Sequence, residues 1–175
     1  MLIHGPGASD ILAGGGGSDS NSAVYACLMA LSMAFFEAPM RMARYNADGE
    51  REWINDHPMQ GILDAPNPAM NQAELWFWAC WALHVDGNAY FEKVRSGNAD
   101  TGNVVELWPR SPRLMEPKTT SNRDFISFYQ WDLGDGHYRR IETENVVHLK
   151  LGIDDRDQRK GLSGLKRLVR QITSH

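Results

Sequence analysis

Residues 71–87 have the sequence NQAELWFWACWALHVDG. Asn71 and Glu74 have the spacing of a helix-capping box, and Asp86-Gly87 supplies a helix stop. Between these signals lie mostly aromatic and aliphatic side chains, which predict the central buried helix of the fold: Leu75, Trp76, Phe77, Trp78, Cys80, Trp81 and Leu83.

Upstream, a second apolar helix is predicted from about Ala23 to Glu37, ending before Pro39. One stripe of this helix contains Val24, Cys27, Leu28, Leu31 and Phe35, and the opposite side is apolar as well, with Met29, Met33 and Phe36. A helix that is apolar on both sides needs a cover on both sides, from its own fold or from a neighbouring subunit. We expect residues 1–21, which include Gly14–Gly17, to form a flexible glycine-rich arm.

Between the two helices, Met40–Tyr45 and Glu50–Trp53 are predicted to pair as a hairpin around the turn 46–49. A short helix with Asp56 as its cap and Pro58 in its first turn should follow. It closes before the proline-rich connector Asp64–Pro68.

After the central helix the pattern changes to six short strands, at 88–95, 104–108, 114–116, 125–133, 138–141 and 146–151. In the longest of them, Phe125, Tyr129, Trp131 and Leu133 share a face that we expect to be packed. A last helix is predicted after Gly161-Leu-Ser163, with Ser163 as its cap and a stripe of Leu162, Leu165, Leu168, Val169 and Ile172. The whole succession predicts an α+β fold in which apolar helices pack on antiparallel strands and hairpins.

Composition limits the class of protein. The chain has 175 residues, 42% of them apolar and 23% charged, with a formal net charge of -4, which excludes a disordered linker or an acidic tail. The longest apolar stretch, residues 23–36, is shorter than a membrane span, and the first 17 residues lack the pattern of a signal peptide. We therefore expect an intracellular protein without a membrane segment, in which Cys27 and Cys80 are buried reduced thiols.

Charge is distributed unevenly. Residues 1–100 hold 5 Lys or Arg and 12 acids, whereas residues 101–175 hold 13 and 10. The cations gather near the end, so a contact with a polyanion or a partner is sought first at Arg156, Arg159, Lys160, Lys166, Arg167 and Arg170. A small nucleic-acid-binding module that uses this basic segment is one hypothesis for the function.

Motifs for catalysis, cofactors or metals do not emerge. Gly161-Leu-Ser163-Gly164 misses the spacing of a nucleophile elbow, and Gly14–Gly17 lacks the Lys-Ser or Lys-Thr of a phosphate loop. No two histidines have zinc-ligand spacing, and the acids of 154–157 lack the rest of a calcium loop. His148 is interpreted as a surface or pocket-edge histidine. A hydrolase built on His148 and the acidic residues is the weakest alternative, and we predict no catalytic, cofactor or metal site.

The order of several segments resembles the N-terminal half of tailed-phage portal proteins of the HK97-like family. The segments are Ala23–Cys27 with Ala38-Pro39, Asp56–Pro58 with Asp64–Pro68, the aromatic helix closed by Gly87–Tyr90, Val105–Pro109 with Ser111-Pro112, Glu144–Lys150, and Gly161–Ser163. Gly164 departs from the family pattern, which usually has proline after this serine.

This resemblance implies that residues 22–175 form a wing-like α/β region, truncated before the stem and tunnel helices. It implies a structural, non-enzymatic protein of the virion, present in the host cytoplasm during assembly. Copies would form a ring, usually a dodecamer, at one capsid vertex, through which double-stranded DNA is packaged and ejected. The implied partners are other copies of the chain, the terminase, head–tail connector proteins and capsid proteins.

Overall fold

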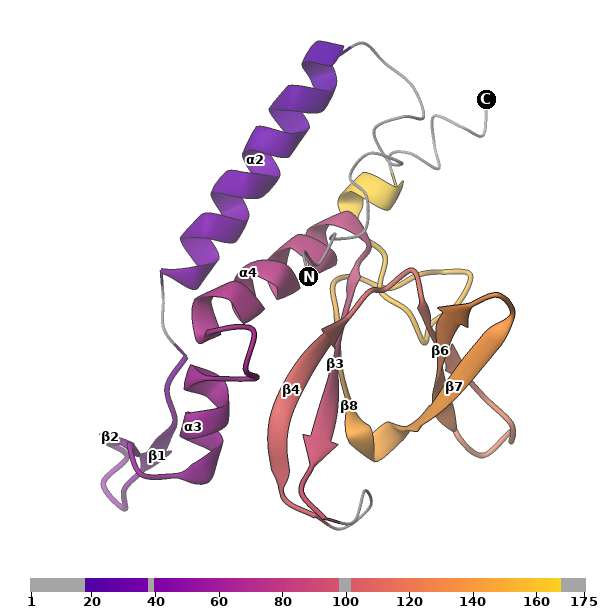
Figure 1. Ribbon diagram of the computed structural model, residues 1–175. Helices are drawn as coiled ribbons and strands as arrows, with labels where there is room; N and C mark the ends of the chain where they lie inside the picture. The colour runs from indigo at the N-terminus through magenta and orange to yellow at the C-terminus, as the bar shows by residue number, and fades with distance from the viewer. Residues whose placement is uncertain (1–17, 38–39, 98–101, 168–175) are drawn as a thin grey trace.

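The computed structural model describes residues 18–37, 40–97 and 102–167. The predicted α+β class is confirmed; of the arm expected at residues 1–21, residues 1–17 lie outside the described residues and residues 18–21 form the start of a helix. Along the chain, the elements are α2 (Ser18–Phe36), β1 (Ala43–Tyr45), β2 (Arg51–Trp53), α3 (Pro58–Asp64), α4 (Gln72–Val85), β3 (Asn88–Arg95), β4 (Val104–Arg110), β5 (Met115–Lys118), β6 (Phe128–Gly134), β7 (His137–Glu142), a 3-10 turn at Thr143–Asn145 and β8 (Val146–Lys150) (Figure 1).

Helix α4 begins and ends at the residues that its sequence predicts. The Asn71 side chain accepts from the Glu74 backbone N–H at 3.0 Å, and the Glu74 carboxylate accepts from the Asn71 N–H at 2.8 Å. At the other end, Gly87 has a φ of +97°, a conformation that glycine adopts without strain. The helix packs between α2 and β3, as Figure 1 shows, and buries Leu75, Trp78, Ala79, Cys80, Ala82 and Val85.

Strand β3 is the centre of the molecule because both of its faces are buried. It pairs with β4 and β8 in one antiparallel sheet, while β6 pairs with β5 and β7 in a second. Ala89 and Phe91 pack against α4. Tyr90, which points to the opposite face, packs into a second core with Met115, Tyr129, Ile141 and Val146.

Charged side chains join the two sheets beside this second core. The Glu92 carboxylate of β3, whose side chain is 11% exposed, pairs with Arg110 of β4 at 2.6 Å. The same oxygen also pairs with Arg139 of β7 at 2.6 Å. One buried carboxylate on the central strand thus holds cations from both sheets, which compensates its desolvation.

Helix α2 differs from its prediction at its start and in its burial. It begins at Ser18 rather than near Ala23, because adding polar residues to an existing helix costs little once it is nucleated. Tyr25 and Phe35 contact Trp81 and Trp76 of α4, with ring centroids 5.6 and 6.2 Å apart. The opposite side has no cover from the described residues. None of their helices is both long and apolar enough to cross a membrane.

Three further local predictions were wrong. Cys27 is exposed rather than buried, because it lies on the side of α2 that faces away from α4; Cys80 is buried as expected. The cap of α3 is His57, whose Nδ1 accepts from the Met59 N–H at 3.1 Å, since Pro58 already occupies the first helical position. β6 begins at Phe128, so Phe125 lies outside the strand and is 58% exposed. Leu133, at the other end of β6 beside a register shift, is 59% exposed, and only Tyr129 and Trp131 of the expected face pack inward.

We predict that Asn71→Ala lowers the free energy of unfolding by about 1 kcal/mol, because the Glu74 N–H loses its acceptor. Chemical denaturation followed by tryptophan fluorescence measures this loss. Asn122→Ala, an exposed loop change, serves as the control and should alter stability by less than about 0.5 kcal/mol. Equal stability of the two variants would contradict a stabilising cap.

Candidate functional site

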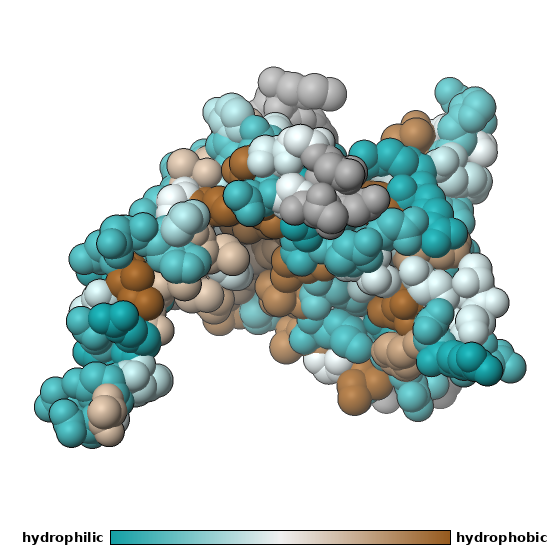
Figure 2. Space-filling view, turned by 90° about the horizontal axis from the view of Figure 1, so that it is seen from below, coloured by the Kyte–Doolittle hydropathy of each residue, from teal (hydrophilic) through white to brown (hydrophobic). Residues whose placement is uncertain are grey.

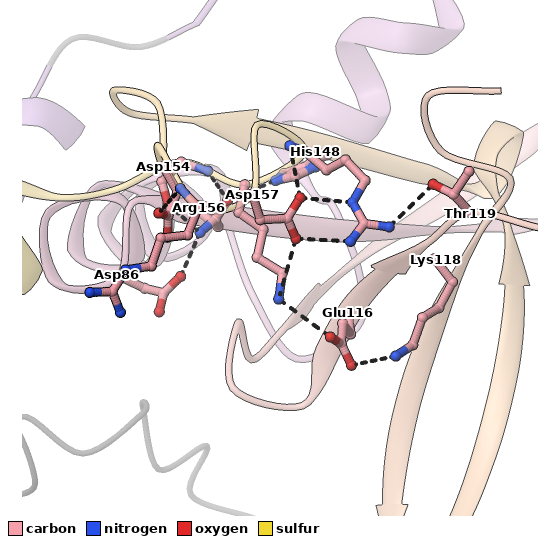
Figure 3. Close-up of polar contacts among 12 residues, drawn as sticks. Asp86, Glu116, Lys118, Thr119, His148, Asp154, Arg156 and Asp157 are labelled. Atoms are coloured by element: carbon pink, nitrogen blue, oxygen red, sulfur yellow. Dashed lines mark hydrogen bonds and ion pairs between the residues drawn. The ribbon is translucent and has the colours of Figure 1, made fainter. Parts of the chain in front are cut away.

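Two of the six predicted polyanion contacts hold a loop of the protein itself. Arg159 pairs with Asp157 at 2.7 Å and donates to the Thr119 hydroxyl at 3.2 Å. Lys160 lies 3.6 Å from the Glu116 carboxylate, which also pairs with Lys118 at 2.8 Å. Figure 3 shows these contacts joining the loop after β8 to the end of β5. The Arg159 guanidinium lowers the pKa of Asp157 by hydrogen bonding to it, and Lys118 and Lys160 lower the pKa of Glu116.

The other four predicted contacts do not gather in one place. Lys166 pairs with Asp86 at 2.6 Å, next to the end of α4. Arg156 lines a groove, Arg167 is exposed, and Arg170 lies outside the described residues. The basic segment is therefore divided between internal ion pairs and single exposed cations.

The groove beside Arg156 lies between the β5–β6 connection and the loop after β8. It is open to solvent and has a volume of about 550 Å³. Its walls contain Arg123, Phe125, Arg156, Asp157 and Arg159. Its three arginines face two aspartates, Asp124 and Asp157, so its field does not favour one sign of ligand strongly.

Sequence analysis identified the cap at Ser163 but missed the exit junction, where residues 161–166 cross the α4–β3 turn at 85–88. The Asn88 side chain accepts from the Gly161 N–H at 2.7 Å and donates to the Gly161 carbonyl at 3.1 Å. The Ser163 hydroxyl donates to the Val85 carbonyl at 2.9 Å. It also accepts from the Lys166 N–H at 3.0 Å, which confirms Ser163 as a helix cap.

Two glycines allow the chains to approach at the exit junction. A Cβ at Gly161 would meet the carbonyl of Gly87, and a Cβ at Gly87 would lie 2.6 Å from the backbone nitrogens of Leu162 and Ser163. Since a side chain fits on neither backbone, the path of residues 161–166 past the α4–β3 turn is set by this contact and by the Lys166–Asp86 ion pair. The helical residues 164–167 follow, and the predicted continuation through Leu168 to Ile172 lies outside the described residues.

His148 lies between the two sheets rather than on the surface. Its Nε2 donates to the Asn88 amide oxygen at 3.0 Å, because that oxygen is an acceptor, and its Nδ1 accepts from the Tyr129 hydroxyl at 3.2 Å. Burial, followed by the charge of Lys150, lowers the pKa of His148 from 6.5 to about 4. Burial also raises the pKa of Tyr129 to about 12. The neutral imidazole therefore links β3, β6 and β8 and has no ring nitrogen left for catalysis.

Metal-binding geometry does not occur in the part of the chain that the structure describes, where no three His, Cys, Asp or Glu side chains converge. Asp154 is nearly buried, and its side chain accepts from the backbone N–H of Arg156 at 3.0 Å. Asp154 and Asp157 thus stabilise the loop after β8 by accepting hydrogen bonds from its backbone.

The sequence of residues 22–175 matches the family model described as phage portal protein. The chain belongs to the phage portal protein family. No curated protein sequence matches it. The order of segments that suggested this family thus predicted the membership correctly.

Solved structures share the fold of this portal family member. A chain in the neck of an empty gene transfer agent (GTA) particle, computed with C6 symmetry, has a TM-score of 0.71 and 17% identity, covering 99% of this chain and 44% of that one. A chain of the native GTA virion has a TM-score of 0.70 and 16% identity, covering 98% and 42%. A third, from the native neck computed with C12 symmetry, has a TM-score of 0.68 and 18% identity, with the same coverages. The portal chain described here spans less than half the length of each.

We predict that Gly161→Ala lowers the free energy of unfolding by about 1–3 kcal/mol, because the methyl group would overlap the Gly87 carbonyl. Gly164→Ala is the matched control. It has no atom within 4 Å of its new Cβ and lies in the helical turn, so it should stabilise by about 0.5 kcal/mol. Denaturation curves measure both; a Gly161→Ala protein as stable as wild type would contradict the close approach.

We also predict a pH dependence of stability that comes from His148. In the unfolded chain this imidazole takes up a proton near pH 6.5, but in the folded chain only near pH 4. Its contribution is therefore complete above pH 6.5 and is lost as the pH falls from 6.5 to 4, by at most about 3 kcal/mol. His148→Gln should flatten this part of the stability curve, whereas His137→Gln, an exposed histidine, should not. Identical slopes for wild type and His148→Gln would contradict the assignment.

Proposed function

We propose that residues 22–175 form the wing-like region of a portal subunit, a structural protein of a phage or gene transfer agent particle. The observation that carries this proposal is the family match over these residues. The likeness of the fold to chains from GTA necks supports it. Copies of the subunit surround one axis at a capsid vertex, and the family's usual number of copies is twelve.

Double-stranded DNA passes through the ring during packaging and ejection, and the protein acts as a passive support. The terminase docks during packaging, and head–tail connector proteins and capsid proteins contact the ring in the virion. The contacts of the chain agree with a structural role. Arg159, Lys160 and Lys166 each pair with a carboxylate of the same fold, so a DNA phosphate would have to displace that partner. We therefore favour the portal over a small nucleic-acid-binding module.

The hydrolase alternative requires His148 as its general base, but both ring nitrogens of His148 are hydrogen-bonded inside the fold. A general base needs a free nitrogen within reach of the proton that it removes. The structural role of portal proteins, to whose family the chain belongs, supports a non-enzymatic function.

Expressed within the complete reading frame that contains it, the chain is expected to assemble into closed rings. Negative-stain electron microscopy would reveal the rings, and mass photometry would give the number of subunits. A protein that stays monomeric at micromolar concentration would overturn the proposal. Binding of duplex DNA that disappears with added salt, by that monomer, would instead favour the nucleic-acid-binding module.

A further inference from the structure

Asn88 is only 2% exposed, beneath a surface of mixed polar and apolar side chains (Figure 2), and its amide uses its complete hydrogen-bonding capacity. The amide nitrogen donates to the Gly161 carbonyl at 3.1 Å and to the Asp86 carboxylate at 2.7 Å. The amide oxygen accepts from the Gly161 N–H at 2.7 Å and from His148 at 3.0 Å. The backbone of Gly161 therefore fixes which end of the amide faces the imidazole.

This orientation of the amide determines the tautomer of His148. The oxygen of Asn88 carries no proton, so Nε2 of the imidazole donates the hydrogen between them. Nδ1 is then the nitrogen that accepts from the Tyr129 hydroxyl at 3.2 Å. A second proton on the ring would occupy Nδ1, and the Tyr129 hydroxyl would lose its acceptor. The hydrogen bonds of the closed fold thus fit the neutral ring.

Burial and the neighbouring charges also oppose a proton on this imidazole. Tyr90 of β3 and Tyr129 of β6 pack on it, with ring centroids 4.2 and 5.8 Å from its own, and burial raises the pKa of both tyrosines, so that both are neutral. Burial, followed by the charge of Lys150, lowers the pKa of the imidazole, whereas Asp86 raises it. The Lys166 ammonium lies 2.6 Å from the Asp86 carboxylate and offsets part of its charge. The ring therefore takes up a proton readily only in contact with water.

The exit junction is attached to this interior by individual hydrogen bonds rather than by a β-ladder. Residues 151–163 contain no helix or strand. Two of the four hydrogen bonds of Asn88 go to Gly161, and the Ser163 hydroxyl donates to the Val85 carbonyl at 2.9 Å. A segment held in this way opens at a lower free energy than a strand inside a sheet. Opening would remove both Gly161 bonds and admit water to the amide that contacts the imidazole.

We propose that protonation of His148 opens the exit junction while the rest of the fold stays closed. The imidazole and the junction share the amide of Asn88, so the neutral ring and the closed junction stabilise each other. In the open form the ring takes up a proton near its ordinary pKa of 6.5, whereas in the closed form its pKa is about 4. Linkage then raises the equilibrium constant for opening about 20-fold between pH 7 and pH 5. All of these contacts lie within one copy of the chain, so the opening requires no ring.

Amide hydrogen exchange followed by NMR tests this opening. After correction for the intrinsic exchange rates, the protection of the Gly161 N–H should fall about 20-fold between pH 7 and pH 5. Low concentrations of urea should leave it unchanged, because a local opening exposes little surface. The Ala79 N–H, in the middle of α4, should stay at least about tenfold more protected and should lose protection with urea. Equal protection of Gly161 and Ala79 at both pH values would overturn the proposal.

Two matched variants show whether His148 is responsible. In His148→Gln, which cannot take up a proton, the protection of Gly161 should not change between pH 7 and pH 5. In His137→Gln, an exposed histidine of β7, the fall seen in wild type should persist. An equal fall in His148→Gln would overturn the proposal.

A measurement on the wild-type protein covers the case in which His148→Gln does not fold. The ring ¹⁵N chemical shifts of His148 should show the neutral Nε2–H form at pH 7. Acidification should protonate the ring in step with the loss of Gly161 protection. A ring that titrates near pH 6.5 while Gly161 stays protected would overturn the proposal.

Discussion

Burial of β3 on both faces is the constraint on which the other contacts depend. Ala89 and Phe91 fill the space under α4, while Tyr90 packs on the opposite side against the second sheet. A strand in this position cannot shift by one residue, because such a shift would exchange the two sets of side chains. The register of β3 therefore fixes at once where the helical layer and the β5–β6–β7 sheet lie.

Because side chains alternate between the two faces of β3, its polar residues also lie at fixed positions in the interior. Asn88 and Glu92 share the face of Tyr90, and each lies at one end of the second core. Asn88 binds Gly161 and His148, which connects the interior to the exit junction. Glu92 binds Arg110 and Arg139 across the two sheets. Buried polar groups on the central strand thus orient the segments that surround it, with each group hydrogen-bonded or paired.

Unlike β3, which is buried on both faces, helix α2 packs against the described residues through one side only. Leu28 and Ser32 are buried towards α4, while no residue that the structure describes covers the outer face. In a subunit of a larger assembly, a surface of this kind is stabilised by a neighbour.

Local sequence by itself determined the start and end of α4, the existence of the six strands and the cap at Ser163, because capping boxes, turn glycines and alternation act between residues close in the chain. The order of these segments also sufficed to indicate the family. Only the tertiary structure decided that Cys27 is exposed, that Phe125 does not pack, and which carboxylates neutralise Arg159 and Lys166. Lys166 and Asp86 are separated by 80 residues in the sequence, and the Gly161–Asn88 and Ser163–Val85 partners by 73 and 78. No local sequence pattern encodes a contact between positions so far apart in the chain. They meet because β8 pairs with β3 and the Leu162 N–H donates to the Leu151 carbonyl just after β8, which brings residues 161–166 to the α4–β3 turn.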